Sequence, residues 1–214
     1  MKRILALILV AVMLLCFAAC DPIVVNPGKE TEKAPTGPSV SDPYENKVYL
    51  KMEVRDFGTM TIELYPDLAP ITVENFLKYV DEGFYDGLTF HRIYNGLVIQ
   101  GGDPSGNGTG GSGLTAIKGE FKANGYDNPL SHTYGVLSMA RRSSPYDSAT
   151  SQFFICISDK AATFDGNYAT FGKVTDGYDV LDAMAKVELK TNPVTGEKSM
   201  PAETIYIDRI YRVD

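Results

Sequence analysis

The 214-residue sequence has no tryptophan, only two histidines and three cysteines, and fewer basic than acidic residues. With no Cys-x-x-Cys pair and no His-Glu-x-x-His spacing, neither a structural nor a catalytic zinc is expected. The Gly-x-Ser-x-Gly signature of many hydrolases is also missing. Twenty Lys and Arg against 27 Asp and Glu give a net charge of −7, which argues against nucleic acid as the main partner.

Only one long apolar run occurs, and it lies at the N-terminus. Lys2 and Arg3 precede an uncharged stretch over residues 4–19, which is shorter than the roughly 20 residues that a membrane-spanning helix needs. A charged start, a short apolar stretch and small residues before the cleavage site predict a secretory signal peptide over residues 1–19. A retained membrane anchor is the weaker interpretation.

The signal ends in Phe-Ala-Ala-Cys, residues 17–20, which resembles the lipidation box of bacterial lipoproteins. That resemblance implies cleavage before Cys20 and a lipid on its thiol, which would tether the protein to the membrane without a spanning segment. The expected location is the outer face of the bacterial cytoplasmic membrane or another envelope membrane. Plain secretion, with cleavage near Ala19, is the alternative.

Residues 20–46 form a predicted flexible stalk, because they carry five prolines and few apolar side chains. The folded domain is therefore expected over residues 47–214. Outside the signal and Cys20, the one remaining cysteine is Cys156, inside an apolar run. It is interpreted as a small core residue.

The domain opens with the period-two pattern of half-buried strands. Residues 47–55 and 59–65 alternate apolar and polar side chains around Asp56-Phe57-Gly58, which predicts a hairpin. Short apolar runs suited to further strands follow at residues 88–90, 97–100, 134–139, 152–157, 169–174 and 203–213.

Two segments have helical spacing instead. Pro70 is expected to open a helix that has Thr72 as its cap and ends at Gly83, and residues 178–187 supply a second helix. Many short strands with two distant helices favour a mainly β fold, a closed barrel whose open ends the helices cover. A parallel βαβ fold would need helices between most strands.

The glycine-rich stretch over residues 101–113 contains a Gly-x-Gly-x-x-Gly match at residues 106–111. No helix follows whose N-terminus could hold a pyrophosphate, so dinucleotide binding is not expected. A surface loop against which an extended peptide can lie is the preferred interpretation.

Five motifs occur in the order and spacing of the cyclophilins, the peptidyl-prolyl cis–trans isomerases. They read FHRIYNGLVIQGGD (residues 90–103), GTGGSG, GVLSMA, SATSQFFICIS and FDGNYATFGKV. The resemblance covers about residues 47–213. It implies a closed eight-stranded antiparallel β barrel capped by two α helices, isomerase activity on X–Pro bonds, and no metal or organic cofactor.

The resemblance also assigns the site. Arg92 would donate to the prolyl nitrogen as the amide twists, and Gln100 would position Arg92 and the substrate. Phe154 would form part of an apolar slot for the proline ring, and the other matching positions are Leu97, Met139, Phe164 and, at its rim, Tyr168. Positions matching contacts to the residues before proline are Gly108, Thr109, Gly110, Ala140 and Arg141.

The sequence departs from well-studied members of the family at several positions. Leu97 replaces a phenylalanine, Tyr168 replaces a histidine, and residues 141–150 form a longer stretch. Thr163 stands where some members have a tryptophan whose indole donates a hydrogen bond to the inhibitor cyclosporin.

The predicted function is isomerisation of X–Pro bonds in exported or envelope proteins, which assists their folding. Expected partners are proline-containing peptides, unfolded exported proteins, and the membrane through the lipid on Cys20. The chain is expected to be a monomer, because nothing predicts a large interface. One alternative is a cyclophilin-fold module that binds proline peptides with incidental turnover. A solute-binding lipoprotein is disfavoured, because no βα alternation is present.

Overall fold

The computed structural model describes residues 44–213 except residues 112 and 194. The predicted signal peptide, Cys20 and all but the last residues of the stalk lie outside that range. The helices are α1 (Pro70–Asp81) and α2 (Tyr178–Ala185), with short 3₁₀ turns η1 (Lys122–Asn124) and η2 (Asp159–Phe164). The strands are β1 (Val48–Val54), β2 (Gly58–Leu64), β3 (Thr89–Tyr94), β4 (Val98–Gly101), β5 (Val136–Met139), β6 (Phe153–Cys156), β7 (Thr170–Asp176), β8 (Leu189–Thr191), β9 (Lys198–Pro201) and β10 (Ile205–Val213).

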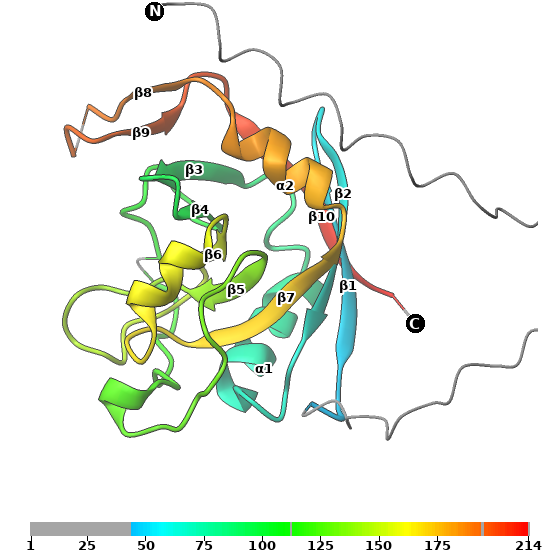
Figure 1. Cartoon of the computed structure of the whole chain (residues 1–214), viewed down its shortest axis with the longest axis vertical. Helices are drawn as coiled ribbons and strands as arrows, with labels where there is room; N and C mark the ends of the chain where they lie inside the picture. Colours follow the sequence, from blue (N-terminus) through cyan, green and yellow to red (C-terminus); the bar gives the residue numbers. More distant parts are fainter. Residues whose placement is uncertain (1–43, 112, 194, 214) are drawn as a thin grey trace, which may run out of the picture. The chain divides into compact units, whose positions relative to one another are not determined.

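Eight of these strands close into an antiparallel barrel in the order β1-β10-β3-β4-β6-β5-β7-β2 (Figure 1). The predicted mainly β, eight-stranded antiparallel barrel is confirmed. Each expected apolar run contributes a strand, and the first hairpin turns where Asp56 and Gly58 adopt positive φ angles of 64° and 128°.

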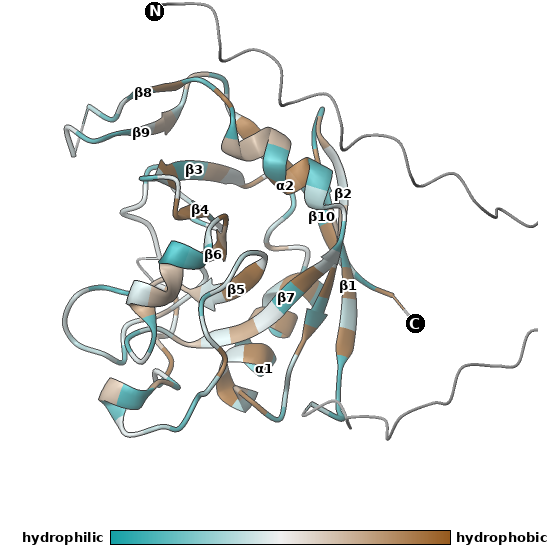
Figure 2. Cartoon of the chain, viewed as in Figure 1, coloured by the Kyte–Doolittle hydropathy of each residue, from teal (hydrophilic) through white to brown (hydrophobic). Residues whose placement is uncertain are grey.

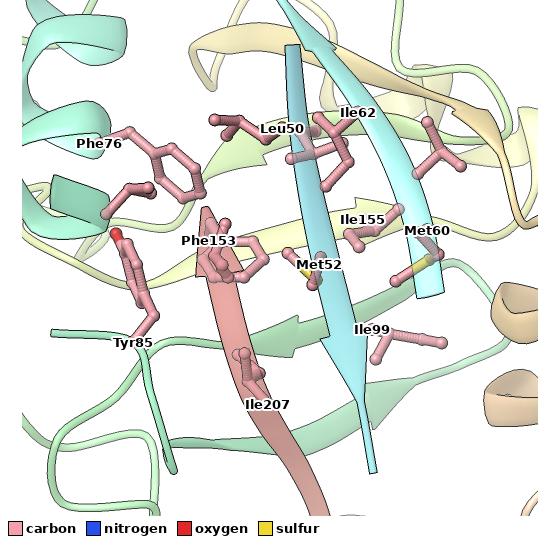
Figure 3. Packing of buried hydrophobic residues seen from close by; sticks show 14 of the residues in the cluster. Leu50, Met52, Met60, Ile62, Phe76, Tyr85, Ile99, Phe153, Ile155 and Ile207 are labelled. Atoms are coloured by element: carbon pink, nitrogen blue, oxygen red, sulfur yellow. The ribbon is translucent and has the colours of Figure 1, made fainter. Parts of the chain in front are cut away.

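The barrel interior is filled by alternate side chains of its strands. Figure 3 shows Met52, Met60 and Ile155 from three strands pointing into one shared space. Phe153 meets the ring of Phe76 edge to face at 5.4 Å, which joins α1 to the core. Figure 2 shows hydrophobic segments along the strands and α1 and more polar connecting loops, as expected when one face of each element is buried.

Helix α1 begins at Pro70, as predicted, but Thr72 is not its N-cap. The N-cap residue is Ala69, whose side chain makes no capping hydrogen bond. The buried carboxylate of Glu120 supplies the cap instead: it accepts from the backbone N–H groups of Ile71 and Thr72 at 3.1 and 2.8 Å. A residue 48 positions away therefore satisfies the free donors of the first turn.

A two-stranded hairpin outside the barrel was not predicted. Strands β8 and β9 pair with each other only, and Figure 1 shows them as an orange arm beside β3. Contacts between β9 and β3 place this arm along the barrel edge. The residues just before β9 therefore reach a surface that β3 also forms.

Candidate active site

Arg92, Gln100 and Phe154 form one row across three neighbouring strands. The register pairs Arg92 of β3 with Gln100 of β4, and Gln100 with Phe154 of β6. Because directly opposed residues share a face of a sheet, the three side chains lie next to one another. The row lies outside the barrel, since Ile99, Phe153 and Ile155, the strand neighbours of Gln100 and Phe154, fill the interior. The structure thus brings together the three residues predicted to be catalytic.

A chain of hydrogen bonds runs along this row. Nη1 of Arg92 donates to Oε1 of Gln100 at 3.2 Å, and Nε2 of Gln100 donates to Oε1 of Gln152 at 2.9 Å. Nε2 of Gln152 in turn faces the backbone carbonyl oxygens of Gly108 and Gly110 at 3.5 and 3.4 Å. Each amide thus presents its oxygen to a donor and its nitrogen to an acceptor, which connects Arg92 with the glycine-rich loop.

The guanidinium of Arg92 has a second partner, Glu197, which precedes β9. Nε and Nη2 of Arg92 donate to the two carboxylate oxygens at 2.8 and 3.1 Å. The hydrogen bond from Arg92 is the main cause that lowers the pKa of Glu197, so the carboxylate is ionised at neutral pH. The guanidinium carbon also lies 4.2 Å from the ring centre of Tyr94, over the ring face.

An apolar surface lies beside the row, formed by a cluster separate from the barrel interior. Phe154 meets the rings of Phe164 and Tyr168 edge to face, at 6.0 and 5.7 Å. The cluster also contains the buried Val98, and it includes, partly exposed, the predicted residues Leu97 and Ala140. An aromatic corner with aliphatic neighbours is suited to a proline ring.

Met139 does not belong to this surface, contrary to the prediction. It is 1 % exposed and packs in the barrel interior with Leu137. The physical reason is strand alternation in β5, which turns Leu137 and Met139 inward and Val136 and Ser138 outward. Val98, two residues before Gln100 on the same face of β4, occupies the slot cluster instead.

A buried polar network supports Phe154 from behind. The ring of His132 stacks on Phe154 at 5.8 Å with an angle of 17° between the planes. Nδ1 of His132 lies 2.7 Å from the Asp165 carboxylate and Nε2 lies 3.0 Å from Oγ of Ser138. Burial lowers the pKa of His132, so the ring is neutral at pH 7; Asp165 can only accept, which assigns the proton to Nδ1.

Ser138, His132 and Asp165 have the connectivity of a hydrolytic triad but not its exposure. Ser138 and His132 are 0 % and 1 % exposed, so no substrate carbonyl can reach the serine hydroxyl. The network is therefore a rigid support that fixes the orientation of Phe154.

The glycine-rich loop is wrapped around the buried Asp103. The Asp103 carboxylate accepts from the backbone N–H groups of Ser105, Asn107 and Gly108 at 3.1, 3.0 and 2.6 Å. A Cβ on Gly110 would lie 1.7 Å from Oδ1 of Asp103, so only glycine fits there. The motif thus serves a tight loop rather than a phosphate site.

The predicted contacts for residues before proline do meet in one place. Gly108, Thr109, Gly110, Ala140 and Arg141 line a pocket of about 160 Å³ together with Gln100 and Gln152. The pocket continues the row from the side of Gln152. Backbone carbonyls and amide side chains are available there to an extended peptide.

The guanidinium of Arg141 is largely used within the protein. Its Nε donates to the backbone carbonyl of Asn167 and its Nη1 to that of Arg142, both at 2.8 Å. Its guanidinium carbon lies 4.7 to 5.0 Å from the ring centres of Tyr168, Tyr146 and Phe121. Arg141 thus holds the longer loop over residues 141–150 against the aromatic side chains beside the slot.

Several residues of this arrangement were not predicted, among them Val98, Gln152, His132 and Glu197. Val98 could have been predicted from strand alternation, because residues two apart in a strand point to the same face and Val98 lies two residues before Gln100. Gln152 could be found by the same rule, because it lies two residues before Phe154. His132 stacks on Phe154 from a separate segment, and Glu197 lies on the hairpin that was not predicted. Within residues 44–111, 113–193 and 195–213, no cluster of His, Cys, Asp or Glu is suited to a metal ion.

Comparison with known proteins agrees with this geometry. The family model for cyclophilin type peptidyl-prolyl cis-trans isomerase/CLD matches residues 49–211. Peptidyl-prolyl cis-trans isomerase B of Bacillus subtilis is 46 % identical over 132 residues, which are 62 % of this chain and 87 % of that protein. A peptidyl-prolyl cis-trans isomerase of Streptomyces antibioticus is 40 % identical over 158 residues, 71 % of this chain and 90 % of that protein.

A solved structure shows the same fold. The crystal structure of a Cryptosporidium parvum cyclophilin type peptidyl-prolyl cis-trans isomerase matches with a TM-score of 0.68 and 28 % sequence identity. The match covers 79 % of this chain and 99 % of the other. A structure of that protein in the presence of the dipeptide Ala-Pro matches this chain with a TM-score of 0.67. The family match, the barrel and the isomerases among the relatives lead to one conclusion: the chain belongs to the cyclophilin-type peptidyl-prolyl cis-trans isomerases.

Proposed function

We propose that this isomerase acts on X–Pro bonds of exported or envelope proteins, with Arg92 as the donor to the twisting amide. The observation that carries the catalytic part of the proposal is the row of Arg92, Gln100 and Phe154 beside an aromatic-walled surface. Gln100 orients Arg92, and Phe154 with Phe164 and Tyr168 holds the proline ring. The pocket beside Gln152 takes the residues before proline.

The chemistry needs neither a nucleophile nor a proton shuttle. Rotation about an X–Pro bond must break amide resonance, against a barrier of about 18–20 kcal/mol. As the amide twists, the lone pair of the prolyl nitrogen becomes localised and can accept a hydrogen bond. A fixed guanidinium donor interacts more strongly with that twisted state than with either planar one, which lowers the barrier.

Substitution of Arg92 tests the role of this site. Arg92→Ala is expected to lower kcat/KM on a proline peptide at least about tenfold, or about 1.4 kcal/mol of transition-state stabilisation. The matched control is Arg55→Ala, because Arg55 is also ion-paired, to Asp208 at 2.7 Å, and lies over the ring of Tyr206. Unchanged activity in a folded Arg92→Ala variant would refute the mechanism.

The same assay separates the isomerase from the binding-module alternative. An isomerase accelerates exchange between the cis and trans forms of a proline peptide, as measured by NMR exchange or a protease-coupled assay. A binding module would retain peptide affinity and leave that exchange near its uncatalysed time of roughly 10–100 s.

The proposed location of the enzyme rests on its N-terminal sequence alone. Residues 17–20 carry the lipoprotein-like box, and we propose that a lipid on Cys20 tethers the domain to an envelope membrane through the stalk. In the part of the chain that the structure describes, neither helix has the length and hydropathy needed to cross a bilayer.

A labelling experiment tests the tether. In cells that express the full chain, fatty-acid label is expected on the wild-type protein and not on Cys20→Ser, which should leave the membrane fraction or remain unprocessed. Activity of the released domain should be unchanged. Absence of label on the wild-type protein would favour plain secretion.

A further inference from the structure

We propose that Glu197, on the β8–β9 hairpin, is a positioning residue for the isomerase reaction that holds the Arg92 guanidinium in its donating orientation. The inference rests on the proposed role of Arg92 as donor to the twisting amide. No residue of the hairpin entered the predicted site, and Glu197 acts through Arg92 rather than on substrate.

The hydrogen bonds of the guanidinium show how it is held. Arginine has five N–H donors in a fixed plane. Two of them, on Nε and Nη2, donate to Glu197, and one on Nη1 donates to Gln100. Within the described residues this leaves two N–H groups, one on Nη1 and one on Nη2. Glu197 binds the edge of the guanidinium that carries Nε, so the two remaining N–H donors lie on the terminal nitrogens Nη1 and Nη2.

The plane of the guanidinium is fixed as well as its edge. The Tyr94 ring covers one face at 4.2 Å, and the bidentate carboxylate sets the rotation within that plane. Without these contacts the long arginine side chain would retain more of its rotamer freedom. A donor fixed before the amide twists needs no reorganisation during the reaction.

Stability alone does not account for this pair. The side chains of Arg92 and Glu197 are 33 % and 30 % exposed, so solvent screening reduces what their ion pair contributes to the folding free energy. Two other features are needed to form the pair: a hairpin outside the barrel, and contact of β9 with β3. The hairpin thus carries a carboxylate to the side of Arg92 opposite to Gln100 in the hydrogen-bond chain.

The experiment compares Glu197→Gln with Glu203→Gln in the full chain. Gln replaces one carboxylate oxygen with an NH2 donor, so it cannot offer a separate acceptor oxygen to each of Nε and Nη2, whereas the exposed Glu203 lies after β9 and away from the row. Glu197→Gln is expected to lower kcat about threefold to tenfold with KM nearly unchanged, and Glu197→Asp should be intermediate. Circular dichroism and Tm should match those of Glu203→Gln.

A double-mutant cycle tests whether Glu197 acts through Arg92. In an Arg92→Ala background, Glu197→Gln is expected to have no further effect. An equal loss in both backgrounds, or no loss in either, would overturn the inference. Increased activity of Glu197→Gln would overturn it too, because the carboxylate would then compete with substrate for Arg92.

An NMR readout keeps this inference separable from the proposed function. The Nε–H signal of Arg92, identified by its loss in Arg92→Lys, should exchange slowly in the wild type and in Glu203→Gln and broaden in Glu197→Gln. Full activity of Arg92→Ala would refute the proposed mechanism, whatever this signal shows. An impaired Arg92→Ala together with a fully active Glu197→Gln would refute only the positioning role of Glu197.

Discussion

Thr163 illustrates how a single side chain can change inhibitor binding without changing the chemistry. It is exposed in η2, next to the slot residue Phe164, and its hydroxyl donates to the backbone carbonyl of Lys160 at 3.3 Å. The hydroxyl is thus turned towards its own backbone. In family members with tryptophan here, the indole donates to cyclosporin and adds a flat apolar face, and Thr163 provides neither.

We therefore expect an active isomerase with weak cyclosporin inhibition. One lost hydrogen bond costs about 0.5–1.5 kcal/mol, and the lost aromatic contact a similar amount, so affinity should fall roughly tenfold to a few hundredfold. Thr163→Trp should recover part of the binding, with Thr115→Trp, an exposed residue outside the row, as control. Titration of activity with the drug measures this, and tight inhibition of the wild type would contradict it.

At the level of residues, sequence reasoning was reliable where one motif carried the whole arrangement. Arg92 and Gln100 belong to one motif, and their spacing around a two-strand turn places them opposite each other. Met139 was assigned to the wrong surface, because the resemblance gave the residue type at that position but not the face of β5 to which its side chain points. Glu197 could not be found, because its partner is 105 residues away and no local pattern signals an ion pair.

At the level of elements, α1 depends on a residue outside the helix. Glu120 is 0 % exposed, and besides the two backbone donors it accepts from the Thr72 hydroxyl at 2.6 Å. A carboxylate there also interacts favourably with the positive end of the helix dipole. The segment that contains Glu120 is thereby fixed to the start of α1.

Glu120→Gln is expected to destabilise the protein by about 2–4 kcal/mol. The amide replaces one acceptor oxygen with a donor that faces other donors, in a site without water access. Urea unfolding gives the free energy, and the control is the exposed Glu74→Gln on α1, which should change it by no more than about 0.5 kcal/mol. Equal stability of the two variants would show that the cap is unimportant.

The helices and strands differ in how well they could be predicted from the sequence. The helix start at Pro70 and the first hairpin follow from local rules, proline at the first helical turn and alternation around a turn. The cap by Glu120 does not, because it is a tertiary contact that spans 48 residues. The β8–β9 hairpin was missed because its strands are short and the buried residues of β9 are Ser199 and Pro201, so the two strands carry little apolar periodicity.

For the whole molecule, the barrel was predictable because strand count and family resemblance agreed. The closed barrel also buries polar side chains whose burial could not be predicted from the sequence pattern, among them those of the two histidines. Burial lowers the pKa of His91 to about 4 and also lowers that of His132, although the charge of Asp103 partly opposes the effect at His91. Both histidines are therefore neutral in the folded protein at pH 7.

These lowered pKa values link stability to pH. In the unfolded chain both histidines titrate near 6.5, and the folded-state pKa of His91 is about 4, so between these two pH values the unfolded state binds more protons at His91 than the folded state does. The lowered pKa of His132 acts in the same direction. The contribution of the neutral histidines to the free energy of unfolding is therefore fully present above about pH 6.5, and it is lost as the pH falls below that value. Asp81, Asp165 and Glu197 have lowered carboxyl pKa values, so their contributions are present above about pH 4–4.5 and are lost only at lower pH.

We expect His91 alone to reduce the free energy of unfolding by about 2–3 kcal/mol between pH 7 and pH 4.5, which urea unfolding at the two pH values measures. His91→Asn should lose this part of the slope, because asparagine does not titrate. If that variant fails to fold, the Cε1–H resonances of the wild-type histidines give the same information, since a folded-state pKa of about 4 predicts no shift of the His91 signal near pH 6. A midpoint near 6.5 for that signal would mean that His91 accepts a proton without cost in the fold, and the predicted pH dependence would then be wrong.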